Sequence, residues 1–289
     1  MVAAAVVALL AGCGTATPGA SARPSPTPSG WTSSPSPTSA PATSSPTPSS
    51  PATTPLTSSP SPSASRTVPP SASPSGLPAA LLGQDITAIP TTRRVVALTF
   101  DAGGNADGVP LILATLRNKG VPGTFFLTGT WSRAFPTSAA EIAAAGHLIG
   151  NHTDTHPHFA ALTEAQQAAE VAAGAAAVMA ATGVDPRPLF RFPFGERTAA
   201  DVRQLNGLGY LCVSWTVDTI GWKGTSGGQS VDTVVSRVLG GLRPGEIVLM
   251  HVGSHPTDGS TLDAAALGRI IDELRGRGYS FVTLAALTS

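Results

Sequence analysis

The sequence predicts an α/β fold in which about seven parallel strands form a distorted (β/α) barrel. Short apolar segments recur along residues 88–289, and segments with helical character separate them. The apolar segments are continuous rather than alternating, as expected of parallel strands that are covered on both faces. Seven repeats favour a closed or nearly closed barrel over an open sheet.

A different composition precedes this domain. Residues 1–90 hold 18 of the 27 prolines, and residues 14–87 consist mainly of Pro, Ser, Thr and Ala. Such a segment cannot bury enough apolar surface to offset the loss of chain entropy on folding. We therefore expect residues 14–87 to be a disordered Pro/Ser/Thr-rich linker. It is long enough to span a thick layer, at roughly 3.1 Å per residue when extended.

The first 13 residues, MVAAAVVALLAGC, form an apolar run. The run is too short to cross a bilayer as a helix and is typical of a signal peptide. Its last four residues, ending in Cys13, resemble a bacterial lipobox, in which the cysteine is lipidated. No Lys or Arg precedes the run, so the true start is expected upstream of Met1. We expect an extracytoplasmic lipoprotein that is anchored to the membrane and faces the cell wall; plain secretion is the alternative.

The charge and cysteine content exclude several classes of protein. Lys plus Arg and Asp plus Glu number 17 each, and no basic cluster occurs, so nothing indicates a nucleic-acid partner. Cys212 is the only cysteine besides Cys13 and lies in the apolar run YLCVSW. It is expected to be a small buried hydrophobic residue rather than a nucleophile.

The elements of the domain follow in order. Strands are predicted at residues 94–100, 123–127, 147–151, 189–193, 210–216, 246–251 and 280–284. Helices are predicted near residues 108–119, 137–145, 163–182, 198–208, 230–240 and 261–276. The third helix starts in a Thr163-Glu-Ala-Gln166 capping box and stops at Gly183.

Polar residues stand at the ends of several of these strands. They are Asp101, His152, His156, Arg191, Asp218 and His251. In a parallel barrel these strand ends open on one face, where functional sites are built. Each residue alone could be a cap or a loop residue, but six at equivalent ends predict a shared site.

Two of these histidines have the spacing of a metal-binding pair. On a helical turn, His152 and His156 would share a face and offer two nitrogen ligands to a divalent ion. The spacing alone is a weak signal. His147 and His158 are interpreted as strand-start and loop histidines, and Asp154 is left unassigned because it would point away from the pair.

Residues 92–289 resemble the polysaccharide deacetylase family, the NodB-homology carbohydrate esterases. Five motifs occur in the family's order: Thr99-Phe-Asp-Ala-Gly103, His152-Thr-Asp-Thr-His156, Arg191-Phe-Pro-Phe-Gly195, Asp218-Thr-Ile-Gly-Trp222 and Leu249-Met-His251. The resemblance implies a distorted (β/α) barrel. It also implies removal of N- or O-acetyl groups from an acetylated polysaccharide with one divalent ion, usually zinc or cobalt.

The resemblance also implies roles for single residues. Asp101 would be the general base toward metal-bound water, and Arg191 would keep it ionised. His251 would be the general acid, with Asp218 holding it charged and correctly turned. The backbone N–H of Phe194 would stabilise the oxyanion, and Trp222 and Leu249 would line the acetyl pocket and groove, where an aromatic face suits a sugar ring.

The chain departs from the family pattern at two positions. Ala102 stands where the family has a metal-binding aspartate, and Gly221 stands where an acid is usual. Asp107 and His255 are candidate substitute ligands, although Asp107 is better explained by the start of the following helix. Two functions therefore stay open: a metal-dependent deacetylase of peptidoglycan, chitin-like or xylan substrates, or a catalytically impaired relative that only binds glycan.

Overall fold

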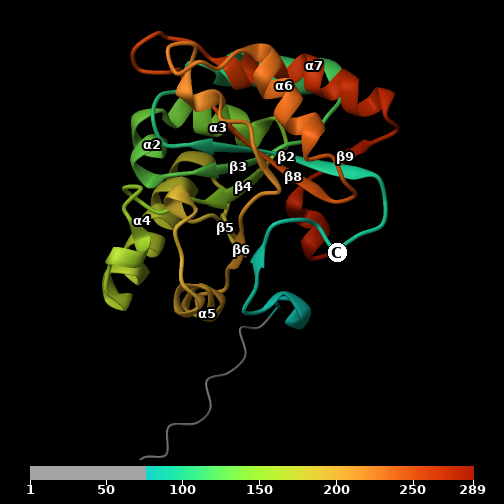
Figure 1. Ribbon diagram of the computed structural model, residues 1–289. Helices are drawn as coiled ribbons and strands as arrows, with labels where there is room; N and C mark the ends of the chain where they lie inside the picture. The colour runs from blue at the N-terminus through green and yellow to red at the C-terminus, as the bar shows by residue number, and fades with distance from the viewer. Residues whose placement is uncertain (1–75) are drawn as a thin grey trace, which may run out of the picture. The chain divides into compact units, whose positions relative to one another are not determined.

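The computed structural model describes residues 76–289 (Figure 1). The predicted signal peptide with Cys13, and nearly all of the predicted linker, lie outside the described residues. No helix within residues 76–289 combines the length and the apolar composition that crossing a bilayer requires.

All seven predicted strands are present, together with two further short ones. In chain order, the strands of the described residues are β1 (Asp85–Ile86), β2 (Val95–Ala102), β3 (Thr124–Leu127), β4 (Leu148–Asn151), β5 (Leu189–Phe190), β6 (Leu211–Val213), β7 (Val217–Asp218), β8 (Glu246–His251) and β9 (Ser280–Val282). Strands β1 and β7 were not predicted, because two residues are too few to show a hydrophobic pattern. β1 also lies within residues 14–87, where a disordered linker was predicted; its pairing with β6 and the burial of Ile86 show that the end of this segment belongs to the folded domain.

All six predicted helices are present as well. The helices are α1 (Val109–Lys119), α2 (Gly129–Ala134), α3 (Pro136–Ala144), α4 (Glu164–Thr182), α5 (Ala199–Gly207), α6 (Val231–Gly240) and α7 (Leu262–Gly276). Short 3-10 helices are η1 (Ala79–Leu81), η2 (Phe159–Ala161), η3 (Pro193–Gly195), η4 (Gly221–Lys223) and η5 (Leu284–Leu287). The short α2 was missed; it starts where the Thr128 hydroxyl accepts a hydrogen bond from Trp131 N–H.

The strands form one parallel sheet in the order β1-β6-β5-β4-β3-β2-β8-β7, and β9 pairs with the beginning of β2. The two ends of this order, β1 and β7, do not pair with each other within the described chain. The sheet is thus a half-barrel, which confirms the parallel α/β architecture. Thr216 links the two edges, because its hydroxyl donates to the Thr87 carbonyl and accepts from Ile247 N–H.

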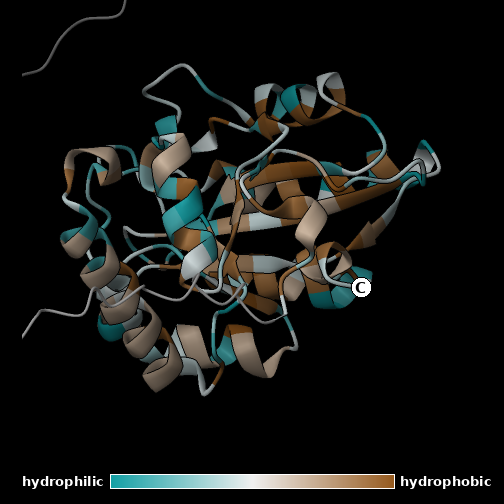
Figure 2. Cartoon of the chain, turned by 90° about the horizontal axis from the view of Figure 1, so that it is seen from below, coloured by the Kyte–Doolittle hydropathy of each residue, from teal (hydrophilic) through white to brown (hydrophobic). Residues whose placement is uncertain are grey.

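Every residue of β2 is buried, which explains its continuous hydrophobicity. Val96, Leu98 and Phe100 pack in a cluster with α1, α6 and α7, which cover that face. Ala97 belongs to a second cluster with residues of β3, β5 and β6, inside the half-barrel. Figure 2 shows the hydrophobic strands enclosed by helices of mixed character. The alternation of side chains along β2 therefore turns Asp101 toward the interior.

Candidate active site

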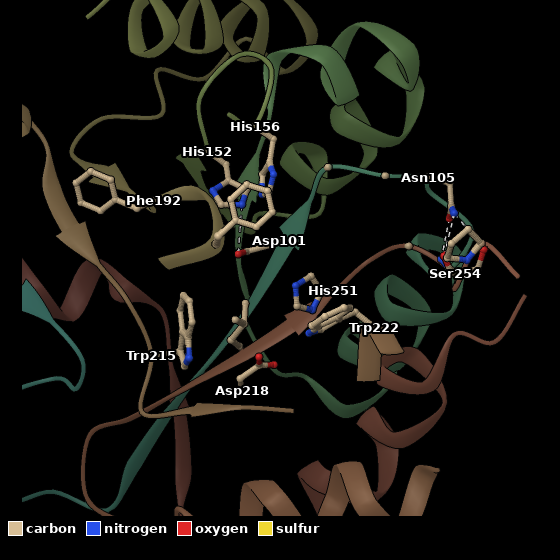
Figure 3. A pocket seen from close by; sticks show the side chains of 16 residues that line it. Asp101, Asn105, His152, His156, Phe192, Trp215, Asp218, Trp222, His251 and Ser254 are labelled. Carbon is tan, nitrogen blue, oxygen red and sulfur yellow. Dashed lines mark hydrogen bonds and ion pairs between the residues drawn. The ribbon is translucent and has the colours of Figure 1, made fainter. Parts of the chain in front are cut away.

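The carboxyl ends of β2 and β8 bring the predicted acid and base side by side. Asp101 and His251 are register partners on these adjacent strands. A cavity of about 510 Å³ opens at this end of the sheet (Figure 3). Eight predicted site residues line it: Asp101, His152, His156, Phe194, Asp218, Trp222, Leu249 and His251. The structure thus brings together strand ends that lie up to 150 residues apart in the sequence.

Asp101 is held by a buried arginine. Arg191 Nη1 donates to Asp101 Oδ1 at 2.7 Å and to the Thr99 hydroxyl at 2.9 Å. The remaining guanidinium nitrogens donate to the carbonyls of Val213 and Ser214. Burial alone would raise the pKa of Asp101, but Arg191, with smaller effects of nearby histidines, outweighs it and lowers that pKa below its usual value. Asp101 is therefore a carboxylate at neutral pH.

The histidine pair meets in a different way from the one expected. Residues 152–156 do not form a helical turn, because Thr153 and His156 have φ angles of 69° and 61°. The helical explanation of the spacing was wrong, since loop dihedrals rather than helix periodicity set the side-chain directions. The two rings still contact each other edge to face, with centroids 4.8 Å apart, and both face the cavity (Figure 3).

The tautomer of His152 follows from its contacts. Its Nδ1 lies 2.8 Å from the Arg191 carbonyl oxygen, which can only accept, so Nδ1 carries the hydrogen. This leaves the lone pair of Nε2 directed to the cavity, 3.5 Å from Asp101 Oδ2. Burial lowers the pKa of His152, and it lowers the pKa of His156 to about 4. Both imidazoles are therefore neutral near pH 7, the form that binds metals.

The side chains at the cavity that are suited to bind a divalent ion are two imidazoles, those of His152 and His156. Within residues 76–289, no group of three or more His, Cys, Asp or Glu side chains is arranged to hold a metal ion. Neither substitute candidate faces the pair: Asp107 accepts from the Ser254 hydroxyl, and His255 lies against Asp258. Ala102 packs in the apolar cluster under the helices and does not line the cavity.

His251 contacts a different acid from the one predicted. Asp263, on α7, accepts a hydrogen bond from the His251 backbone N–H and lies 3.6 Å from ring Nδ1. Asp218 lines the cavity but forms no ion pair with His251 in the described structure; its Oδ1 accepts from Ile220 N–H. Burial would lower the pKa of His251, yet Asp263, followed by Asp101 and Asp218, raises it above the usual value.

Aromatic and apolar residues form the cavity walls. Phe194 and Trp222 are about half exposed at its rim, and Leu249 is buried in its floor. The Phe194 ring contacts His156 and stacks on His158. Phe194 has a φ angle of 57°, and its N–H donates to no other described residue. A free backbone donor at the cavity can stabilise a developing oxyanion.

Three residues with no predicted site role lie outside the cavity lining. His147 accepts from Gly123 N–H just before β4, and His158 Nδ1 lies 2.9 Å from the carboxylate of exposed Glu196. Asp154 pairs with Arg133 on α2 and so turns from the imidazoles.

Sequence reasoning missed several cavity residues as well as Asp263. Trp215 and Phe192 form walls, and Asn105 and Ser254 line the far side (Figure 3). Asn105 joins the loop after β2 to the loop after β8, because its amide exchanges hydrogen bonds with Ser254. Their position directly after strand ends was the available signal, but loop residues have no periodic pattern to identify them.

Comparison with known proteins agrees with this geometry. Residues 88–213 match the family model described as polysaccharide deacetylase. A peptidoglycan-N-acetylglucosamine deacetylase of Bacillus cereus is 35% identical over 200 residues, covering 68% of this chain and 70% of that protein. A chitooligosaccharide deacetylase of Bradyrhizobium is 34% identical over 202 residues, covering 67% and 90% respectively.

Among solved structures, the chain is similar to a wild-type CE4 family pseudoenzyme from Bacillus anthracis. The TM-score is 0.65 at 28% identity, and the match covers 72% of this chain and 69% of that chain. The matched sequences and the shared strand-end motifs lead to one assignment: the chain belongs to the polysaccharide deacetylase family, the carbohydrate esterases with NodB homology.

Proposed function

We propose that this protein removes acetyl groups from a cell-wall or related polysaccharide by metal-dependent hydrolysis. The observation that carries the proposal is the pairing of Asp101 with His251 across adjacent strands, beside two neutral imidazoles. A carboxylate and a histidine on the same cavity are suited to act as general base and general acid. The deacetylase names of the relatives support the same reaction class.

Asp101 is the proposed base. Its lowered pKa keeps it ionised, and its Oδ2 faces His152 while Oδ1 is held by Arg191. Arg191 has four acceptors in all and stacks on Phe126, so it fixes the orientation of the carboxylate. In the proposed reaction Asp101 takes the proton of the water that attacks the acetyl carbonyl carbon.

His152 and His156 are the proposed ligands of a divalent ion, zinc or cobalt. Borderline metals of this kind prefer imidazole nitrogen, and the fixed tautomer of His152 presents Nε2 for coordination. When bound, such an ion would act as a Lewis acid, which lowers the pKa of water and polarises a carbonyl.

His251 is the proposed general acid. Its raised pKa favours the protonated ring, which can deliver a proton to the departing amine or alkoxide. The free N–H of Phe194 is the proposed oxyanion donor. Asp218 adds negative charge to the same cavity without touching the ring, which favours the protonated histidine from a distance.

The substrate is proposed to be an acetylated glycan chain. Exposed Trp222 and Phe194 at the rim offer aromatic faces to sugar rings, and apolar Leu249 suits an acetyl methyl group. Acetylated amino sugars of peptidoglycan come first because of the predicted anchor and linker; chitin-like and xylan substrates fit the same chemistry.

A second candidate is a catalytically impaired relative that binds glycan without hydrolysing it. Two observations favour it: the metal donor set stops at two histidines, and a pseudoenzyme is among the similar structures. The charged partners of both proposed catalytic residues favour the hydrolase, because a binding module needs neither a buried Arg191–Asp101 pair nor acids that raise the pKa of His251.

Acetate release distinguishes the two candidates. Purified protein is incubated with acetylated peptidoglycan, chitooligosaccharides and acetylated xylan, each with chelator, with zinc and with cobalt. The hydrolase releases acetate that His251→Ala does not release, and the metal raises the rate. Glycan binding without acetate release under every condition would support the impaired relative.

Location is a separate proposal. We expect a lipid on Cys13 to hold the protein at the outer face of the membrane, because acylation of a single cysteine adds apolar chains that insert into the bilayer. Cys13→Ser should move the protein from the membrane fraction to the soluble fraction. Unchanged fractionation would contradict the lipid anchor.

A further inference from the structure

Asp263 holds His251 at two points. Its Oδ2 accepts from the His251 backbone N–H at 2.8 Å and lies 3.6 Å from ring Nδ1. The Asp263 side chain is only 3% exposed. One buried carboxylate therefore fixes the end of β8 and faces one ring nitrogen, which leaves Nε2 as the nitrogen available for proton transfer.

The Asp263 carboxylate does not cap the helix on which it lies. An acid in the first turn commonly accepts from the free N–H groups of the helix terminus. Among the described residues, however, the only hydrogen bond to its carboxylate comes from β8. Asp263 Oδ1 and His251 Nδ1 are both buried without a hydrogen-bond partner. A protonated Nδ1 that closes the 3.6 Å contact would form a charge-assisted hydrogen bond.

Gly221 makes room for this carboxylate. A Cβ atom at residue 221 would lie 2.3 Å from Asp263 Oδ1 and 2.7 Å from its Cγ. Gly221 is not among the residues with positive φ, so close approach rather than backbone conformation requires glycine here.

We propose that Asp263 is the positioning residue for the proton donor His251, and that residue 221 is a glycine because the Asp263 carboxylate takes the space of its side chain. The role assigned to His251 rests on the proposed function. Asp263 keeps Nδ1–H directed toward α7 while Nε2–H is given to the leaving group.

Other titratable groups also face His251. They are Asp101 on β2, Asp218 on β7, and His152 and His156 after β4. The acids favour the protonated ring, and the two histidines, which are neutral near pH 7, oppose it only when they are themselves protonated. Asp263 is the only one of the three acids in ion-pair contact with His251 among the described residues.

The test measures the His251 ring directly. The protonation of His251 is followed by NMR on metal-free protein with isotope-labelled histidine, and His251→Gln assigns the signal. Asp263→Asn keeps an oxygen acceptor for the backbone N–H but removes the charge, and it should lower the pKa of His251 by about one unit. Asp218→Asn is the matched comparison and should lower it less. A larger shift in Asp218→Asn, or no shift in Asp263→Asn, would overturn the proposal.

The pH profile of acetate release gives a second readout. In Asp263→Asn the alkaline limb of kcat/KM should move to lower pH, because His251 loses its proton earlier. A wild-type protein that releases no acetate, with the NMR shift intact, would contradict the proposed function and leave the Asp263 contact standing.

The space requirement has its own thermal test. Gly221→Ala should lower the Tm in the wild-type background. The loss should be smaller in the Asp263→Ala background, where the atoms that would clash are gone. Equal losses in the two backgrounds would overturn this part of the proposal.

Discussion

The two ends of β8 each carry a titratable side chain, and the surroundings of these two side chains are opposite in character. His251, at the carboxyl end, lies at the cavity with its side chain 29% exposed and with three acids around it. Glu246, at the amino end, is fully buried, and neither of its carboxylate oxygens has a hydrogen-bond partner in the described structure. Acidic partners raise the pKa of His251, whereas burial raises the pKa of Glu246 to about 7.

Because of this difference, we expect one end of β8 to matter for function and the other end to matter only for stability. At the carboxyl end the polar groups are paired across strands and face a cavity, so their charges are available for chemistry. At the amino end a carboxyl is closed off from water, so its ionisation only costs folding free energy. Substitutions at one end should change metal binding or turnover, and those at the other end should change stability alone.

The largest expected effect is on metal binding at the carboxyl end of the sheet, where His152 and His156 follow β4 beside the end of β8. His152→Ala or His156→Ala should abolish binding of zinc or cobalt almost completely, because one remaining protein ligand cannot hold the ion. Calorimetric titration of metal into each variant measures this loss. Affinity unchanged in His156→Ala would remove the proposed metal site.

Asp107→Ala and Ala102→Asp are the matched controls for that titration. Asp107 is engaged with Ser254, so its removal should leave the metal affinity close to wild type. Ala102→Asp adds an anionic ligand and should tighten binding if the carboxylate reaches the cavity; its present apolar surroundings oppose this. An Asp107→Ala loss equal to that of His156→Ala would instead identify Asp107 as a ligand.

Removal of the proposed base or acid comes next. Asp101→Asn and His251→Ala should each lower turnover by about 10²-fold or more, the range for lost general acid–base catalysis. His251→Ala should leave folding nearly intact, since the ring is partly exposed. Asp101→Asn should also reduce stability, because buried Arg191 loses its charged partner. Wild-type turnover in folded variants would refute these roles.

The smallest expected effect on function is at the amino end of β8, because Glu246 does not line the cavity and should change stability only. The pKa of Glu246 is raised from 4.5 to about 7, so the folded state binds this proton more tightly than the unfolded state. The resulting stability is fully present below pH 4.5 and is lost as the pH rises to about 7. Glu246→Gln cannot ionise and should gain up to about 3 kcal/mol relative to wild type between these limits.

Urea unfolding of both proteins at pH 5 and pH 8 measures this difference, with acetate release as the second readout. Asp272→Asn, at an exposed acid paired with Lys119, should show the pH dependence of the wild type. Parallel profiles for Glu246→Gln and wild type would contradict the prediction. A large loss of turnover in Glu246→Gln would contradict the claim that the amino end of β8 affects stability alone.

Local patterns in the sequence were enough to predict most elements of the fold. Continuous apolar runs such as residues 94–100 indicate strands buried on both faces, because burial imposes hydrophobicity at every position. The capping box at Thr163 and the stop at Gly183 bound α4 as expected. The resemblance to the family supplied the roles proposed for single residues, which strand-end position alone could not assign.

The tertiary structure decided which of those residues touch. The His152 and His156 rings meet through two left-handed loop residues, and no spacing rule predicts such dihedrals. The acid beside His251 comes from α7 instead of from Asp218 on β7, because helix packing brings Asp263 into the space that Gly221 leaves open. Sequence periodicity determines which faces are buried, since that depends only on local geometry. Contacts between elements depend on register and packing, which are settled only when the whole sheet assembles.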